Sequence, residues 1–556
     1  MTAQDASLMD AASTFGRVGF GLRTLVRKWE SLQVELHGSY SIQRFISMFN
    51  YRVSTGISRS LVVLITIPLL PLFCVAMIDA LPMNSPNLGL AGSGTVWVRG
   101  VSVGLADSFT LVWMFCQYVP ELKLSRRTLL STTVAATAIS HLAVLGLIMM
   151  FGYPLPFTLL WMTGPWLATL ALSLKLCRGN LLNKNPESWR EVRRFAILSV
   201  MHTSSGLIIT GFNAYFHSVS EKWQTVIALL VPAFKITERN LFCRILRGKD
   251  DQKPELVVFT VEISNALFIS TSMQQAASTN TSAMLILIDF VQLLVSLCDM
   301  NLMLKSINEI TAKMGITSNE IISSAFTIST KYSELANATS SIDAAAHSKS
   351  EVFRLSTLDK IQANTINLKR VLTSKNQVAP TLAEHNMAVV PDTSMAVECN
   401  SVGPTTNDIE RIEHISPRER QLLLRKALQI LFLTEFLLLN ELMEVLTPVM
   451  YSCYLVILFY GPNREYYPLF DGIDEAAFQK IVRNIVVYGL LEMGSCVLLV
   501  VVVHRTTHKF PLQHLAFAVS CSWGKIQCKL VIWLTLLLQS TIPQLGSGYK
   551  FKGETN

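Results

Sequence analysis

Long apolar runs constrain this chain more than any other feature. A helix needs about 20 mostly apolar residues to cross the hydrocarbon core of a bilayer. Runs of this kind recur at residues 61–81, 100–119, 128–151, 155–174, 195–216, 223–240, 256–277, 283–304, 427–460, 484–503 and 513–541. We therefore expect an all-α fold, a polytopic helical membrane bundle with about 10–11 transmembrane helices.

The composition supports this interpretation. Half of the 556 residues are apolar and only 15% are charged, whereas a soluble domain carries about 25% charged residues. This balance excludes a disordered chain and argues against a soluble globular protein. The net charge of +8 does not predict a nucleic-acid partner, because the basic residues lie mainly in short loops between apolar runs; the lipid bilayer is the expected partner.

The charge of the loops alternates along the chain. The loops at 82–96, 152–154 and 278–282 contain neither Lys nor Arg, whereas the loops between them are rich in both. Basic loops stay on the cytoplasmic side of a membrane. We therefore expect an integral membrane protein with a cytoplasmic N-terminus, and we take the plasma membrane as the default membrane. Asn280 begins a glycosylation sequon in a predicted outer loop.

The runs divide the chain into membrane and soluble segments. We expect a cytoplasmic amphipathic segment (1–59), a first bundle of about eight spans (60–304), a cytoplasmic insert (305–426) that is helical and then a flexible linker (375–408), a second membrane segment of two or three spans (427–543) and a tail (544–556). The basic amphipathic N-terminal segment either lies on the inner leaflet or packs against the bundle.

A helix-start signal precedes the ninth run. Ser416, Pro417 and Glu419 have the spacing of an N-cap, a first helical residue and a capping box. One helix running from the cytosol into the membrane would explain why this run is too long for a single span. The last run carries Lys525 and Lys529, so whether it crosses the bilayer stays open.

Sequence motifs of catalysis are missing. The chain has no P-loop, no H-E-x-x-H, no G-x-S-x-G and no Gly-rich dinucleotide fingerprint. Its ten cysteines form no C-x-x-C pair, so neither a zinc site nor a redox dithiol is indicated. We therefore expect no enzyme, no metal and no cofactor.

Ionisable residues inside the apolar runs are the remaining functional signal. A charge at the bilayer centre costs roughly 2.5–3.5 kcal/mol on insertion scales, so such residues face the bundle interior, a partner or water. For Lys235, Asp299, Glu435 and Glu441, near the ends of runs, we expect structural pairs or interfacial positions, and for His141 a hydrogen-bonded interior position. Deeper residues are candidates for a transport path: Glu262, Asn265 and Asp289, with Asp107 and Glu492 as second candidates.

The seventh run is the most polar. On a regular helix, Glu255, Glu262, Asn265 and Ser272 fall within about 100° of one another. A face this polar should line a wet cavity or a hydrogen-bonded seam. If Asp289 of the next run met Glu262, two carboxylates sharing one site would suit a proton or a cation.

Several short motifs resemble a known group of proteins. They are Tyr40-Ser41-Ile42-Gln43-Arg44, Ile67-Pro68-Leu69-Leu70-Pro71-Leu72, Trp97-Val98-Arg99, Val119-Pro120-Glu121-Leu122, Gly461-Pro462-Asn463-Arg464-Glu465-Tyr466-Tyr467, and Trp523 with Gln527-Cys528-Lys529-Leu530. The chain is similar in these motifs to a family of uncharacterised multi-pass membrane proteins of oomycetes. This resemblance implies the membrane topology and no activity.

Two classes of function fit these observations. The first is a transporter or channel for a small solute or ion, with the polar residues above lining its path. The alternative is a membrane receptor or scaffold that recruits a cytoplasmic protein partner through residues 305–426. An intramembrane enzyme ranks third, because no nucleophile–base or metal-ligand spacing is present. A wet cavity favours transport, whereas a dry, packed bundle favours the scaffold.

Overall fold

The computed structural model describes residues 38–85, 88–155, 157–220, 223–224, 230–275, 321–331, 416–507 and 510–542, with scattered residues between 287 and 312. Within these ranges every regular element is a helix, which confirms the predicted all-α class. The predicted linker at 375–408, the tail at 544–556 and most of the N-terminal segment lie outside the described residues.

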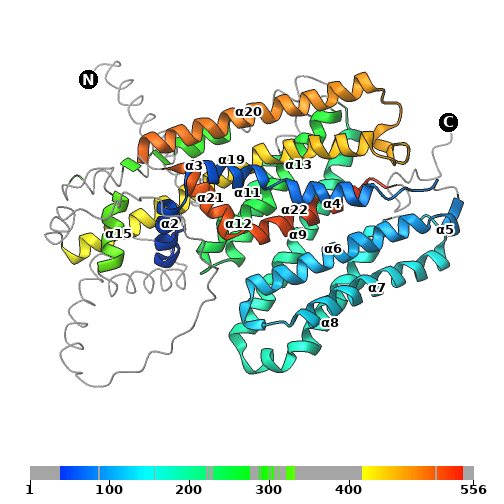
Figure 1. Cartoon of the computed structure of the whole chain (residues 1–556), viewed down its shortest axis with the longest axis horizontal. Coiled ribbons are helices and arrows are strands. Elements are labelled where there is room, and N and C mark those ends of the chain that lie inside the picture. The colour runs from blue at the N-terminus through cyan, green and yellow to red at the C-terminus, as the bar shows by residue number, and fades with distance from the viewer. Residues whose placement is uncertain are drawn as a thin grey trace, which may run out of the picture.

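Two long helices, α19 (Pro417–Tyr460) and α20 (Glu475–Thr507), run side by side along the molecule (Figure 1). α19 begins as predicted. The backbone N–H of Glu419 donates to the Ser416 hydroxyl, and the backbone N–H of Ser416 donates to the Glu419 carboxylate at 3.1 Å. This reciprocal capping box satisfies two donors at the helix start. A single helix of 44 residues then continues through the predicted ninth run.

The first part of the chain supplies a broken helix and a lobe of three helices. α2 (Ile42–Ser54) precedes α3 (Ile57–Thr66) and α4 (Leu69–Asp79), which are separated at Pro68 because proline lacks an amide donor. After the short α5 (Gly89–Gly92), α6 (Gly94–Tyr118), α7 (Arg126–Phe151) and α8 (Thr158–Lys184) pack against one another in the lower right of Figure 1.

α2 is a packing helix. Its Phe45 and Met48 are buried, and Phe49 stacks on Phe326 of α15 (Ile321–Lys331) with ring centroids 3.9 Å apart. α2 also packs against α21. The N-terminal segment was expected either to lie on the inner leaflet or to pack against the bundle. Residues 42–54 form an amphipathic helix that packs against the bundle.

The middle of the chain is more polar. It contains α9 (Pro186–Ser218), α11 (Leu230–Ile245) and a continuous rod built from α12 (Lys253–Val257), a π-helical turn η5 (Val258–Glu262) and α13 (Ile263–Gln275). α13 packs against α9, α19 and α20. This rod carries the polar residues of the predicted seventh run into the centre of the molecule.

The last run is bent. α21 (Pro511–Cys521) and α22 (Trp523–Ser540) meet at an angle of 75°, which is the geometry of a broken span or a re-entrant pair. α22 packs against α4 and α6, and α21 packs against α2 and α3. The bend lies next to Ser522, where the last run changes direction.

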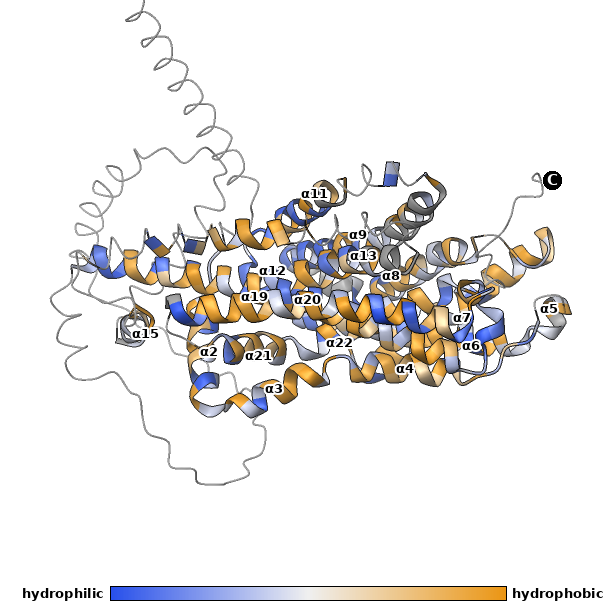
Figure 2. Cartoon of the chain, turned by 90° about the horizontal axis from the view of Figure 1, so that it is seen from above, coloured by the Kyte–Doolittle hydropathy of each residue, from blue (hydrophilic) through white to orange (hydrophobic). Residues whose placement is uncertain are grey.

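Six described helices are long and apolar enough to cross a membrane, and the bent pair makes a seventh if it counts as one span. They coincide with seven of the eleven predicted runs. The other four runs fall on α9, on α11, on the rod of α12, η5 and α13, and on residues 283–304, which are only partly described. Most residues of α3 and α4 are hydrophobic (Figure 2), and several large apolar side chains of these helices are exposed, as a lipid-facing surface requires.

Candidate functional site

A buried ion-pair network occupies the centre of the molecule. The Glu262 carboxylate, at the end of the π-helical turn, forms ion pairs with two basic side chains of α11. Lys235 Nζ lies 2.6 Å from one of its oxygens, and a guanidinium nitrogen of Arg239 lies 2.6 Å from the other. The side chain of Glu262 is fully buried and that of Lys235 is 4% exposed. A buried carboxylate needs such pairing because it has lost its hydration.

α19 completes this network. Lys235 Nζ also lies 3.2 Å from Glu444, and Arg239 donates to the Asn440 side-chain oxygen at 3.1 Å. The Asn440 amide nitrogen in turn donates to Glu444 at 3.0 Å. The network therefore holds two cations and two carboxylates, and it joins α11, η5 and α19. A charge-balanced, hydrogen-bonded set of this kind fixes the relative positions of its helices.

Two further carboxylates lie beside Glu444. Ligand oxygens of Glu441, Glu444 and Glu492 are all within 4.8 Å of one another, and all three residues are buried. Glu492 comes from α20 and the other two from α19. Carboxylates this close repel one another when all are ionised, and a shared proton or a cation offsets that repulsion.

The polar face predicted for the seventh run is divided in two. Glu255 turns towards α22, where its carboxylate pairs with Lys529 at 2.5 Å and accepts hydrogen bonds from the Tyr118 hydroxyl at 3.0 and 3.1 Å. Glu262 turns towards α11. The prediction of one face was wrong because it assumed regular α-helical rotation, and the π-helical turn between the two residues rotates the chain less per residue.

A cavity with seven polar side chains in a mostly apolar lining, called the polar cavity below, lies on the other side of this rod. It has a volume of about 120 Å³ and is lined by six helices. Its polar side chains are Asp107 of α6, Ser140 of α7, Thr163 of α8, His202 and Thr203 of α9, Ser264 of α13 and Gln539 of α22. A polar cavity of this size has room for several water molecules. The bundle is therefore not fully packed at this level.

Asp107 is the acidic side chain among the residues that line this cavity. Its carboxylate accepts a hydrogen bond from the Thr535 hydroxyl at 2.7 Å. Among the described residues, no Lys or Arg pairs with it. Asp107 thus differs from Glu255 and Glu262, which both have cationic partners inside the protein.

A smaller cavity of about 40 Å³ extends this space. It shares Trp166, His202, Thr203 and Ile532 with the first cavity and reaches Thr260 and Lys529. The two cavities together connect the surroundings of Asp107 with the Glu255–Lys529 pair. The residues that they share come from α8, α9 and α22, so the two cavities meet at these helices.

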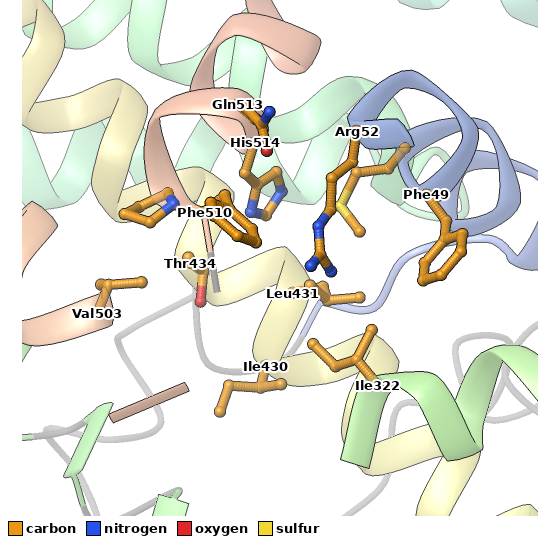
Figure 3. Close-up of a pocket in the computed structure, with 12 residues that line it drawn as sticks. Phe49, Arg52, Ile322, Ile430, Leu431, Thr434, Val503, Phe510, Gln513 and His514 are labelled. Atoms are coloured by element: carbon orange, nitrogen blue, oxygen red, sulfur yellow. The ribbon is translucent and has the colours of Figure 1, made fainter. Parts of the chain in front are cut away.

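A third cavity lies between α2, α19 and α21 (Figure 3). It is mostly apolar, and its polar groups have partners. The Arg52 guanidinium lies 4.5 Å from the Phe510 ring centroid, Gln513 donates to the Thr55 carbonyl oxygen at 2.5 Å, and His514 bonds to the Tyr40 hydroxyl at 2.7 Å. This cavity belongs to the packing of α2, and its basic side chain, Arg52, makes a cation–π contact with Phe510.

The structure places the predicted site residues in three locations. Asp107 lines the polar cavity, Glu262 belongs to the ion-pair network, and Glu492 belongs to the carboxylate cluster. Asn265 is 5% exposed, and its side-chain nitrogen has no hydrogen-bond partner among the described residues. Asp289, Asn280 and Asp299 lie outside the described residues, so the proposed meeting of Glu262 with Asp289 stays a prediction.

The structural interpretation of other buried residues is confirmed. His141 Nδ1 bonds to the Thr137 carbonyl oxygen at 2.8 Å. Glu435 pairs with Arg44 at 2.6 Å and accepts a hydrogen bond from Tyr40. Lys235 is likewise part of an interhelical pair.

Two of the short motifs meet in one buried cluster at the other end of α19. Arg99 donates to the Asp79 carboxylate at 3.2 Å and to the Tyr467 hydroxyl oxygen at 2.9 Å, while Tyr467 donates to Asp79. Asn463 accepts from the Met83 backbone N–H at 2.6 Å. Burial raises the pKa of the Tyr467 phenol, so it stays protonated and acts as a donor. The motifs themselves do not indicate that they touch.

No protein-family model, no curated protein and no solved structure matches this chain. The resemblance to the oomycete membrane proteins therefore stays a prediction, and the function has to be argued from the geometry of the site.

Proposed function

We propose that the chain is a transporter or channel for a small solute or ion, and that the polar cavity at Asp107 is its binding site. The observation that carries this proposal is the carboxylate of Asp107, which faces a polar cavity between helices without a cationic partner among the described residues. A carboxylate in a low-dielectric space favours a cation as its counter-charge. The favoured substrate is therefore a small cation.

The surrounding groups support the same assignment. Hydroxyl and amide groups such as Thr203, Ser264 and Gln539 line the cavity with Asp107. They can replace part of the hydration shell of a small ion or polar solute. The nearby carboxylates Glu255 and Glu262 are already neutralised by Lys529, Lys235 and Arg239, so they do not compete for a cation.

The test is flux through the purified full-length protein in proteoliposomes. The probes are protons, sodium, potassium and tetramethylammonium, each driven by its own gradient. We expect one of them to pass, and we expect Asp107→Asn to lower that flux at least about tenfold, a loss of about 1.4 kcal/mol in binding. Asp471→Asn is the matched control, because it makes the same chemical change in an exposed loop.

Two outcomes would overturn the proposal. One is the absence of flux with every probe from protein that is folded by circular dichroism. The other is a flux that Asp107→Asn and Asp471→Asn reduce equally. The alternative, a receptor or scaffold that acts through residues 305–426, stays a prediction, because only 321–331, 416–426 and isolated positions of this insert are described.

A further inference from the structure

A wide apolar groove lies at one end of the helical lobe. It has a volume of about 610 Å³, within the range of ligand-binding pockets. Its walls come from the last turns of α6, the first turns of α7, the second half of α8 and the start of α9. Nearly all of its surface is apolar, and Leu172 and Val200 in its lining are exposed. This shape and chemistry suit an aliphatic chain.

Two cations stand in the wall of this groove. They are Lys175 of α8 and Arg193 of α9, both exposed, and Trp189 lies beside them. Neither cation has an acidic partner among the described residues. The carboxylates nearby are already used, since Glu187 pairs with Arg190 at 3.2 Å and Glu191 pairs with Arg194 at 2.8 Å. The groove therefore combines an apolar wall with uncompensated positive charge at one end.

We propose that this groove binds an anionic phospholipid, with one acyl chain along the apolar wall and the phosphate at Lys175 and Arg193. Charge complementarity selects this occupant over a zwitterionic lipid, because basic pockets between transmembrane helices bind anionic headgroups. Trp189 fits the same placement, since tryptophan favours the level of the headgroups in a bilayer. The site is separate from the polar cavity at Asp107, and the proposal of lipid binding does not depend on the proposed transport function.

The experiment uses the full-length protein in mixed micelles, titrated with phosphatidylglycerol or with phosphatidylcholine of the same acyl chains. Brominated acyl chains report contact by quenching tryptophan fluorescence, and native mass spectrometry counts the retained lipids. We expect saturable binding that favours phosphatidylglycerol. The double variant Lys175→Gln/Arg193→Gln should weaken that binding roughly 30-fold, about 2 kcal/mol for two lost cations.

Matched variants separate the groove from general surface charge. Arg126→Gln/Arg127→Gln removes the same charge from exposed positions at the same end of the lobe that do not line the groove, and it should change binding less than about threefold. Ala196→Phe fills the groove without changing charge, so it should lower the binding of both lipids. Circular dichroism checks that each variant is folded.

Three results would overturn the proposal. The wild-type protein would bind the two lipids equally, or the two double variants would lose phosphatidylglycerol binding to the same extent, or Ala196→Phe would bind like the wild type. Either of the first two results would mean that lipid contacts the groove as it contacts the rest of the membrane surface, without a specific site. The third would place the bound lipid elsewhere.

Discussion

The side-chain amide of Gln527 donates a hydrogen bond of 3.1 Å to the carbonyl oxygen of Ile67. In a regular helix this carbonyl would accept from the amide of the residue four positions later. That residue is Pro71, which has no N–H. Gln527, on α22, thus replaces the bond that proline removes from the broken helix of α3 and α4, and both residues are buried.

Gln527→Leu should destabilise the protein by about 1–3 kcal/mol, the cost of leaving a buried carbonyl without a donor. Pro71→Ala restores an amide at position 71, so the same Gln527→Leu change should cost about 1 kcal/mol less in that background. The measurement is thermal or denaturant unfolding of all four variants in one detergent. Independent, additive effects of the two changes would refute this account of the pair.

Local signals in the sequence were sufficient for parts of the fold. The apolar runs predicted the candidate spans, because a helix in lipid has to satisfy its own backbone and present apolar side chains. Ser416 and Glu419 predicted the start of α19, since a capping box depends only on residues three positions apart. Asp107 was a candidate because a carboxylate inside an apolar run is costly anywhere but at a polar site.

Pairings between distant segments could not be predicted from the sequence. Arg44 and Glu435 are separated by 391 positions, and Lys529 and Glu255 by 274. No local pattern indicates which buried acid meets which base. Lys529 shows the same limit, because nothing in its own segment indicates that Glu255 neutralises its charge inside the bundle.

Loss of the Glu262 carboxylate should be among the most damaging single changes. Glu262→Gln leaves Lys235 and Arg239 buried with less compensating charge, and breaking a buried ion pair costs about 3–5 kcal/mol. Glu187→Gln is the control, since its pair with Arg190 is mostly exposed and worth less than about 1 kcal/mol. Melting temperatures of the two variants in detergent test this difference. Similar shifts for both would mean that the network does not hold the helices.

The cluster around Asp79 predicts a difference between two adjacent tyrosines. Tyr467→Phe removes a buried donor to the Asp79 carboxylate, so it should cost about 1–3 kcal/mol. Tyr466→Phe makes the same chemical change in a less buried side chain, and it should stay within about 0.5 kcal/mol of the wild type. Urea or thermal unfolding gives both values. Equal losses would show that the phenol of Tyr467 contributes through packing alone.

The π-helical turn gives the most specific prediction. Such a turn is equivalent to one residue inserted into an α-helix, which lets Glu255 face Lys529 while Glu262 faces Lys235. Deletion of Thr260 should therefore convert the turn into regular helix and preserve both ion pairs, at a cost of roughly 1–2 kcal/mol.

A deletion of one residue within α19 serves as the comparison. α19 is regular around Leu439, so removing that residue rotates everything beyond it by about 100° and takes Asn440 and Glu444 out of the network. We expect that variant to yield no folded protein, whereas the Thr260 deletion should elute as a single species with a cooperative melting transition. If the two deletions were equally damaging, the turn would be part of the packing of the rod rather than an inserted residue that separates two ion pairs.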